Sequence, residues 1–191
     1  MRPLARVLIV LFTAALILAS EASAVSLSFR VGSSYFLPTD EVFRDVYGGG
    51  PAYGAEIALS LGRELEAWVS GSTFGKTGRL TFTGEETEIR LTPFLAGIRY
   101  YFTRTRLQPY IGAGAGYFFY KETSPLGTVK DQNFGLAAHA GLVVGVTRGL
   151  IVNVRAGYST CKVKPDEFEA DLGGLELGLG LGVRFGSSSN R

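Results

Sequence analysis

The stretch at residues 174–185, which reads GLELGLGLGVRF, alternates between two kinds of residue without a break. Successive side chains of a strand point to opposite faces, so one face here is glycine with Glu176 and Arg184, and the other is hydrocarbon. Such a strand suits a membrane-spanning barrel, in which lipid covers the apolar face and a polar lumen covers the other. The apolar face consists of Leu175, Leu177, Leu179, Leu181, Val183 and Phe185.

The two ends of the chain differ from its middle. Arg2 and Arg6 precede an apolar run at residues 7–19, and Ala22-Ser23-Ala24 forms a small-residue cleavage motif. The apolar run is shorter than the ~20 residues that a membrane-spanning helix needs. We therefore expect a signal peptide at 1–24, one barrel domain at 25–185 and a short C-terminal tail at 186–191.

Further segments alternate in the same way. Short turns near Arg63, Arg104 and Arg148 alternate with four long connections. Outer-membrane barrels have an even number of strands, short periplasmic turns and longer outer loops. The chain is therefore predicted to be all-β, an eight-stranded antiparallel up-and-down transmembrane β-barrel with both termini in the periplasm. The other strands are expected at 25–36, 53–62, 65–72, 87–102, 109–119, 135–146 and 150–158, and the long connections at 37–50, 75–86, 121–132 and 160–173.

The fourth of these strands contains a change of parity. Ile89 and Leu91 begin on one face, whereas Ile98 and Tyr100 continue on the other, and Pro93 lies between them. A β-bulge shifts a strand by one residue, and proline is tolerated at bulges. The sequence therefore predicts a bulge at Pro93.

The composition favours a membrane barrel over a soluble carrier barrel. Glycine makes up 26 of the 191 residues, roughly twice the ~7% of average usage, and most of it lies on the polar parity with serine and alanine. That face would make a poor soluble surface, but it suits the narrow bore of a small barrel, where glycines leave room for larger inward residues. Aromatic residues at strand ends are expected to form girdles at the bilayer interfaces: Tyr35, Tyr100, Phe102, Tyr117, Phe119, Tyr158 and Phe185.

The signal peptide, the segment PYIGAGAGY at 109–117 and the closing strand that ends in Phe185 resemble the small eight-stranded outer-membrane β-barrel family. That family includes the outer-membrane protein A barrel, Opa-type adhesins and OmpW-like channels within the porin superfamily. The resemblance implies a location in the bacterial outer membrane. It also implies that Gly180, Val183 and Phe185 form the signal that the barrel-assembly machinery recognises, although the chain continues past Phe185 to Arg191.

Several charged residues fall on the lumenal parity. Buried charges are retained only when they are paired, because an unpaired one costs several kcal/mol. We therefore predict an Arg–Glu network that fills and closes the bore, in which Glu176 bridges to Arg30 or Arg155. The rival interpretation is a narrow charged pore. The predicted network consists of Arg30, Glu56, Glu66, Arg99, Arg155, Glu176 and Arg184.

No motif in the sequence predicts an enzyme, a cofactor or a metal site. His139 is the single histidine, and local spacing places no nucleophile beside it and no further histidine ligands for zinc. The glycines at 112, 114 and 116 alternate within a strand and precede no helix, so they do not form a dinucleotide loop. Cys161 is the single cysteine and is expected to be either a free thiol or an intermolecular partner.

The charge pattern limits the partners. A net charge of +2 is too small to predict nucleic-acid binding. The outer connections carry acidic clusters, which either remain solvated or bind divalent cations that bridge to lipopolysaccharide phosphates. These clusters are Asp40, Glu41 and Asp45; Glu85, Glu86 and Glu88; and Asp166, Glu167, Glu169 and Asp171.

From these features we expect a monomeric integral outer-membrane barrel of structural or surface-interaction type. It would act through four outer loops, in contact with membrane lipid, lipopolysaccharide and an unknown extracellular ligand. The alternative function is a narrow porin or an OmpW-like channel for small or apolar solutes.

Overall fold

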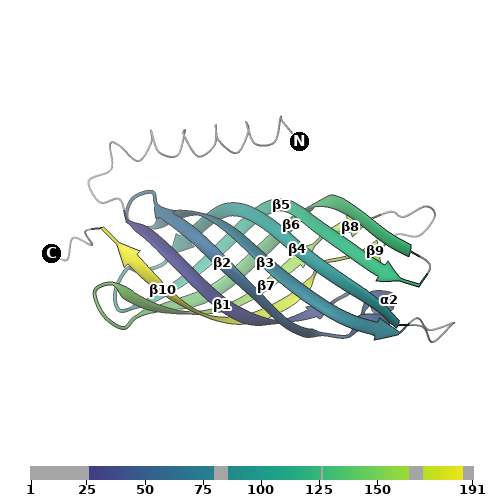
Figure 1. Ribbon diagram of the computed structural model, residues 1–191. Coiled ribbons are helices and arrows are strands. Elements are labelled where there is room, and N and C mark those ends of the chain that lie inside the picture. The colour runs from purple at the N-terminus through teal and green to yellow at the C-terminus, as the bar shows by residue number, and fades with distance from the viewer. Residues whose placement is uncertain (1–25, 80–85, 126, 164–169, 187–191) are drawn as a thin grey trace.

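Eight antiparallel strands close into one barrel in the computed structural model (Figure 1), which describes residues 26–79, 86–125, 127–163 and 170–186. Each strand pairs with its neighbours in sequence, and the first strand, β1, pairs with the last, β10, to close the barrel. This confirms the predicted fold. The barrel strands are β1 (Leu27–Pro38), β2 (Gly50–Ser60), β3 (Leu65–Arg79), β4 (Glu86–Tyr101), β5 (Leu107–Ser124), β6 (Gly127–Gly145), β7 (Leu150–Thr160) and β10 (Gly174–Phe185).

Three smaller elements gather at one end of the barrel, called the outer end below (Figure 1). They are the helix α2 (Glu41–Tyr47) and the short hairpin of β8 (Lys162–Val163) and β9 (Ala170–Asp171). The described chain begins and ends at the opposite, inner end, where Leu27 pairs with Phe185. The predicted signal peptide at 1–24 and the tail from 187 lie outside the described residues. None of the described helices has the length and apolar character to cross a membrane.

The strands separate apolar from polar residues as the alternation predicts. In β1, Phe29 and Val31 are exposed on the outer face, whereas Arg30 between them is buried in the lumen. In β10, the leucines of the 174–185 stretch are exposed and its glycines line the lumen. The girdle residues Tyr35 and Phe185 are also on the outside. Lipid can therefore cover a continuous apolar outer face.

Glycines leave room inside the barrel for large side chains, as the composition suggested. A Cβ atom at Gly97 or Gly114 would lie 2.7 or 2.6 Å from Cζ2 of Trp68. Gly141 leaves room for Tyr110 in the same way: a Cβ atom at Gly141 would lie 2.5 Å from the phenol oxygen of Tyr110. The inward aromatic rings thus pack against glycine residues of the neighbouring strands, which have no side chain.

The predicted bulge at Pro93 is wrong. Gly71 pairs with Phe94 on one side of Pro93 and Phe74 pairs with Leu91 on the other, so β4 keeps one register against β3 throughout. Ile89 and Leu91 therefore lie on the lumenal face, each 2% exposed. Apolar residues are tolerated there because the outer end of the lumen is filled by other apolar side chains, described below.

The third long connection is also shorter than predicted. Strands β5 and β6 stay paired up to Ser124 and Gly127, so the residues expected as a loop at 121–132 form a protruding hairpin. Likewise β3 continues to Arg79 and β4 begins at Glu86, within the connection expected at 75–86. The hydrogen bonds of the sheet continue beyond the hydrocarbon layer of the membrane. There both faces of the β5–β6 hairpin are polar, so the alternation of apolar and polar residues stops.

Candidate functional site: a charged network and an apolar cluster in the lumen

Four charged residues from β1 to β4 meet in the middle of the lumen. Arg30 pairs with Glu56, its partner in the β1–β2 register, and its Nη2 lies 3.0 Å from Oε1 of Glu66. Arg99, the register partner of Glu66, places Nη1 2.8 Å from Glu66 Oε1 and Nη2 2.8 Å from Glu56 Oε2. All four side chains are buried. Each arginine therefore contacts both carboxylates, which compensates charges that would be costly alone.

Aromatic and polar residues surround these four. The hydroxyl of Tyr101 accepts a hydrogen bond from Arg30 Nη2 at 3.1 Å and donates one to Glu66 Oε1 at 3.0 Å. The guanidinium of Arg99 lies 4.5 Å from the ring centroid of Tyr110, whose hydroxyl donates to Asn153 at 2.9 Å. Such cation–π contacts are strengthened when the cation is desolvated. The contacts extend the cluster from β4 across the lumen to β7.

The far side of the lumen carries a second ion pair. Arg155 Nη2 lies 2.7 Å from Glu176 Oε1, on the neighbouring strands β7 and β10, and Arg155 Nη1 lies 3.8 Å from Glu56. Of the two partners considered for Glu176, the structure thus contains Arg155 and not Arg30. Together these side chains span the bore, and every barrel strand contributes one. We call them the central network: Arg30, Glu56, Glu66, Arg99, Tyr110, His139, Arg155 and Glu176.

Arg184 lies apart from this network. Its Nη2 donates to the amide oxygen of Gln108 at 3.1 Å, near the inner end of the barrel, and no carboxylate is paired with it among the described residues. Of the seven predicted lumenal charges, the structure therefore brings six together. The predicted assembly residues Gly180, Val183 and Phe185 lie on β10, and their recognition by the assembly machinery stays a prediction.

Sequence reasoning missed several members of the cluster. Tyr101 stands between Tyr100 and Phe102, and a run of three aromatic residues does not itself indicate which one faces inward. The available signal was that Tyr101 is two residues from Arg99 and therefore lies on the same face of the strand. Arg104 belongs to a short turn, yet its guanidinium lies 3.8 Å from the centroid of the Tyr101 ring and 3.8 Å from Glu66. A turn residue that folds back into the lumen leaves no periodic pattern.

His139 is held among aromatic and charged neighbours. Its Nε2 accepts a hydrogen bond from Arg99 Nε at 3.4 Å, and its ring centroid lies 5.0 Å from that of Trp68 and 5.8 Å from that of Tyr110. A Cβ atom at Gly112 would overlap the imidazole. These contacts give the imidazole a packing role in the central network.

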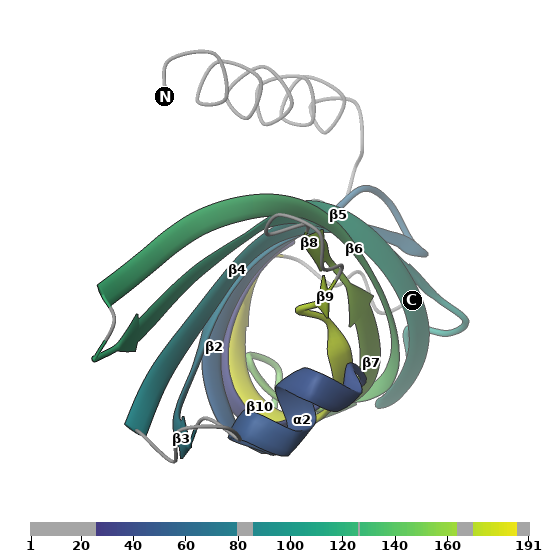
Figure 2. The same cartoon turned by 90° about the vertical axis from the view of Figure 1, so that its right-hand side faces the viewer.

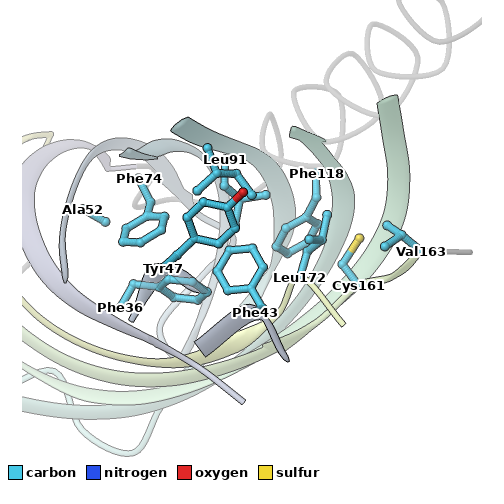
Figure 3. Packing of buried hydrophobic residues seen from close by; sticks show 11 residues of the cluster. Phe36, Phe43, Tyr47, Ala52, Phe74, Leu91, Phe118, Cys161, Val163 and Leu172 are labelled. Carbon is cyan, nitrogen blue, oxygen red and sulfur yellow. The ribbon is translucent and has the colours of Figure 1, made fainter. Parts of the chain in front are cut away.

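An apolar cluster lies at the outer end of the lumen. Asp40 accepts a hydrogen bond from Phe43 N–H at 3.0 Å and so caps α2, which directs Phe43 and Tyr47 toward the barrel. In Figure 2, α2 lies along one edge of the opening and β9 extends into it, and Figure 3 shows the buried side chains gathered together. We call this cluster the apolar cap: Phe36, Phe43, Tyr47, Ala52, Phe74, Ile89, Leu91, Phe118, Cys161, Val163 and Leu172.

Polar contacts fasten the cap to the wall. Tyr47 donates a hydrogen bond to Glu122 Oε1 at 2.6 Å, and burial together with this bond raises the pKa of Tyr47 above its usual value. Asp171 accepts from the backbone N–H groups of Cys161 and Gly173 at 2.7 and 2.8 Å. Burial alone would raise the pKa of Asp171, but hydrogen bonds from Cys161, Thr160 and Gly173 lower it. Tyr47 thereby ties the first connection to β5, and a hydrogen bond from Thr160 to Asp171 ties the fourth connection to the end of β7.

Cys161 is a free, buried thiol within the cap. Burial and, to a smaller extent, the carboxylate of Asp171 raise its pKa to about 11, so the thiol is protonated at neutral pH. Among the described residues no group of carboxylate, histidine and cysteine side chains is arranged to hold a metal ion. Of the acidic residues expected in the outer loops, Asp40 and Asp171 are engaged in hydrogen bonds to the backbone, and Glu85, Asp166, Glu167 and Glu169 lie outside the described residues.

A cavity of about 110 Å³ lies between the central network and the apolar cap. Its walls are mainly glycine, serine and alanine, for example Gly32, Ser70 and Gly178, and Arg155 and Glu176 border it. Those two side chains are 26% and 28% exposed. A cavity of this size has room for a few water molecules. Along the lumen, an ionic layer is thus followed by a small cavity and then by an apolar layer.

Comparison with known proteins agrees with the architecture. Residues 5–185 match the family described as outer membrane protein beta-barrel domain. No curated protein sequence matches the chain.

Several solved structures share the fold. OprG of Pseudomonas aeruginosa superimposes with a TM-score of 0.64 at 14% identity, covering 87% of this chain and 98% of that one. Ail, the attachment invasion locus protein of Yersinia pestis, determined with the heparin analogue sucrose octasulfate, gives 0.59 at 15% identity, covering 84% and 99%. Outer membrane protein W of E. coli gives 0.51 at 14% identity, covering 86% and 100%. At these identities the likeness concerns the fold alone.

Proposed function

Because the chain belongs to the outer membrane protein β-barrel family, whose members lie in the bacterial outer membrane, we propose that it is a closed barrel of structural or surface-interaction type. Its role in this proposal is non-enzymatic and is carried by the outer connections and the outer surface. The barrel itself is an integral outer-membrane protein.

The observation that supports this proposal is that two groups of side chains, the central network and the apolar cap, lie across the lumen. The central network joins side chains from all eight strands, with buried Arg99 at its middle in contact with Glu56, Glu66, Tyr110 and His139. A solute would have to displace these paired charges, which is costly because single charges would then remain unpaired in the bore.

The apolar cap provides a second, independent barrier. Phe43 and Tyr47 from the first connection pack against Phe36 and Phe74, whose ring centroids are 5.1 Å apart. Among the described residues, the outer sides of α2 and of the β8–β9 hairpin, together with the β5–β6 hairpin, extend outward from the barrel. They are the surfaces through which a surface-interaction protein would act.

The two closures can be separated in a liposome-swelling experiment with arabinose as the solute. We expect wild type to swell no faster than empty liposomes, and we expect the same of a variant with Phe43→Ser and Tyr47→Ser, because the central network remains. A general porin in matched liposomes is the positive control. Swelling with wild type would favour the alternative, a narrow channel, and swelling with the cap variant alone would show that the network does not close the bore.

A further inference from the structure

Three basic residues stand in register on adjacent strands near the outer end of the barrel. Arg90 of β4 pairs with Lys121 of β5, and Lys121 pairs with Lys130 of β6. Residues that are directly opposite in antiparallel strands lie on the same face of the sheet, about 5 Å apart. We call these three residues the basic row.

The basic row lies on the outer face. The neighbours of Arg90 in β4, Ile89 and Leu91, are buried in the lumen, so Arg90 points outward and is exposed. Lys121 follows the outward Phe119 and precedes Glu122, which is hydrogen-bonded to Tyr47 in the lumen. Lys130 shares its parity with Phe134, which is 58% exposed.

An aromatic row on the same three strands fixes the level of the basic row. Phe94, Tyr117 and Phe134 are also mutual register partners on the outer face, and the rings of Tyr117 and Phe134 are 5.7 Å apart. Aromatic belts of membrane proteins lie at the level of the lipid headgroups. The basic row is four residues farther out along each strand, about 13 Å at the usual rise per residue. Because strands of such barrels tilt by about 40°, the row stands about 10 Å farther out along the membrane normal, and its long side chains reach the outer part of the headgroup layer from the side.

The charges of the row are largely uncompensated among the described residues. Like charges that are directly opposite in a sheet repel each other. The carboxylate within ion-pair range is that of Glu88, 3.7 Å from Arg90, and both side chains are more than half exposed, so this pair contributes little. The repulsion among the three cations of the basic row would be relieved by anions bound between them.

We propose that the basic row binds the phosphate groups of the outer-leaflet glycolipid, lipid A of lipopolysaccharide. Arginine and lysine are the side chains that recognise phosphate, and the long side chains of the row extend outward from the sheet beside the headgroup layer. The proposal deepens the surface-interaction role but depends only on the placement of the barrel in the outer membrane. It holds whether or not the lumen conducts.

The test is native mass spectrometry of the full mature chain in detergent, which counts bound lipid directly. Wild type is compared with the variant Arg90→Gln/Lys121→Gln/Lys130→Gln. The control variant, Arg63→Gln/Arg106→Gln/Arg148→Gln, removes the same charge from the exposed short turns of the inner end. The ligands are lipid A with two phosphates and the same lipid with its phosphates removed, and heat-modified gel migration verifies that each variant is folded.

We expect the row variant to bind phosphorylated lipid A at least about tenfold more weakly than wild type, the sum of three exposed charge contacts, and the control variant to bind as wild type does. Dephosphorylated lipid should bind wild type and the row variant alike. A Lys121→Arg/Lys130→Arg variant should keep the affinity. Equal binding of phosphorylated lipid A by the row variant and wild type would overturn the proposal. So would stronger binding of a soluble heparin fragment than of lipid A, which would assign the row to an extracellular glycan.

Discussion

Replacing Arg99 with alanine is expected to destabilise the barrel by about 3–5 kcal/mol, as removal of one partner from a buried ion pair does. Arg99 is 0% exposed and contacts both Glu56 and Glu66 at 2.8 Å, so the substitution leaves the two carboxylates with Arg30 as the main compensating charge. Urea unfolding of the protein refolded into lipid vesicles measures the change in free energy of unfolding.

The same strand supplies a matched control. Arg90→Ala also removes an arginine from β4, but Arg90 is exposed, so we expect a change within about 0.5 kcal/mol. Adding Glu66→Gln to Arg99→Ala should recover part of the loss, because it removes one of the two uncompensated charges. A double-mutant cycle isolates this coupling. Equal destabilisation by Arg99→Ala and Arg90→Ala would show that the central network does not hold the strands together.

Replacing Gly97 with valine is expected to cost about 3 kcal/mol or more, at the upper end of the range for overpacked interiors. A Cβ atom at this position would overlap the carbonyl oxygen of Ala113 and would lie 2.6 Å from Cα of Gly114 and 2.7 Å from the Trp68 ring. Two of these neighbours are backbone atoms of β5 and have no rotamer to change. The yield of heat-modifiable folded barrel and its urea midpoint measure the effect.

Gly75→Val is the control for this substitution. The nearest neighbour of a Cβ atom at Gly75 of β3 would be the carbonyl oxygen of Ile89 at 3.9 Å, which is ordinary contact. Valine favours strands at both positions, so intrinsic propensity does not separate the two variants. If both variants fold equally well, the close approach of Trp68 to the β4–β5 wall is not a constraint on the fold.

Alternation of apolar and polar residues predicts the strands wherever one face of the sheet contacts lipid and the other faces the lumen. The expected strand at 174–185 has the same bounds as β10. Beyond the hydrocarbon layer the rule stops working, because both faces of a strand are then polar. For this reason alternation predicts a loop at 121–132, where β5 and β6 form a hairpin. At Pro93 the rule failed because Ile89 and Leu91 face the apolar cap in the lumen.

The candidate site was predictable in its residue types but not in its pairing. Parity places Arg30, Glu56 and Arg99 in the lumen, yet Arg99 reaches Glu56 across an intervening strand, and such contacts depend on the width and tilt of the closed barrel. The cap left a local signal: Asp40 precedes Phe43 and Tyr47, which are four residues apart, as on one face of a capped helix. That signal covers only one to two helical turns, and the glycine and proline residues of the same connection indicate a loop more strongly.

The central claim, that the central network and the apolar cap close the lumen, is tested most directly by single-channel conductance. Wild type and Arg155→Ala are refolded and compared in the same planar lipid bilayer. The closed barrel predicts no steady current steps from wild type, and none from Arg155→Ala, because Arg30, Glu56, Glu66 and Arg99 still fill the middle of the bore. Steady, ion-selective steps from wild type whose size changes with Arg155→Ala would contradict the claim and assign the lumen to transport.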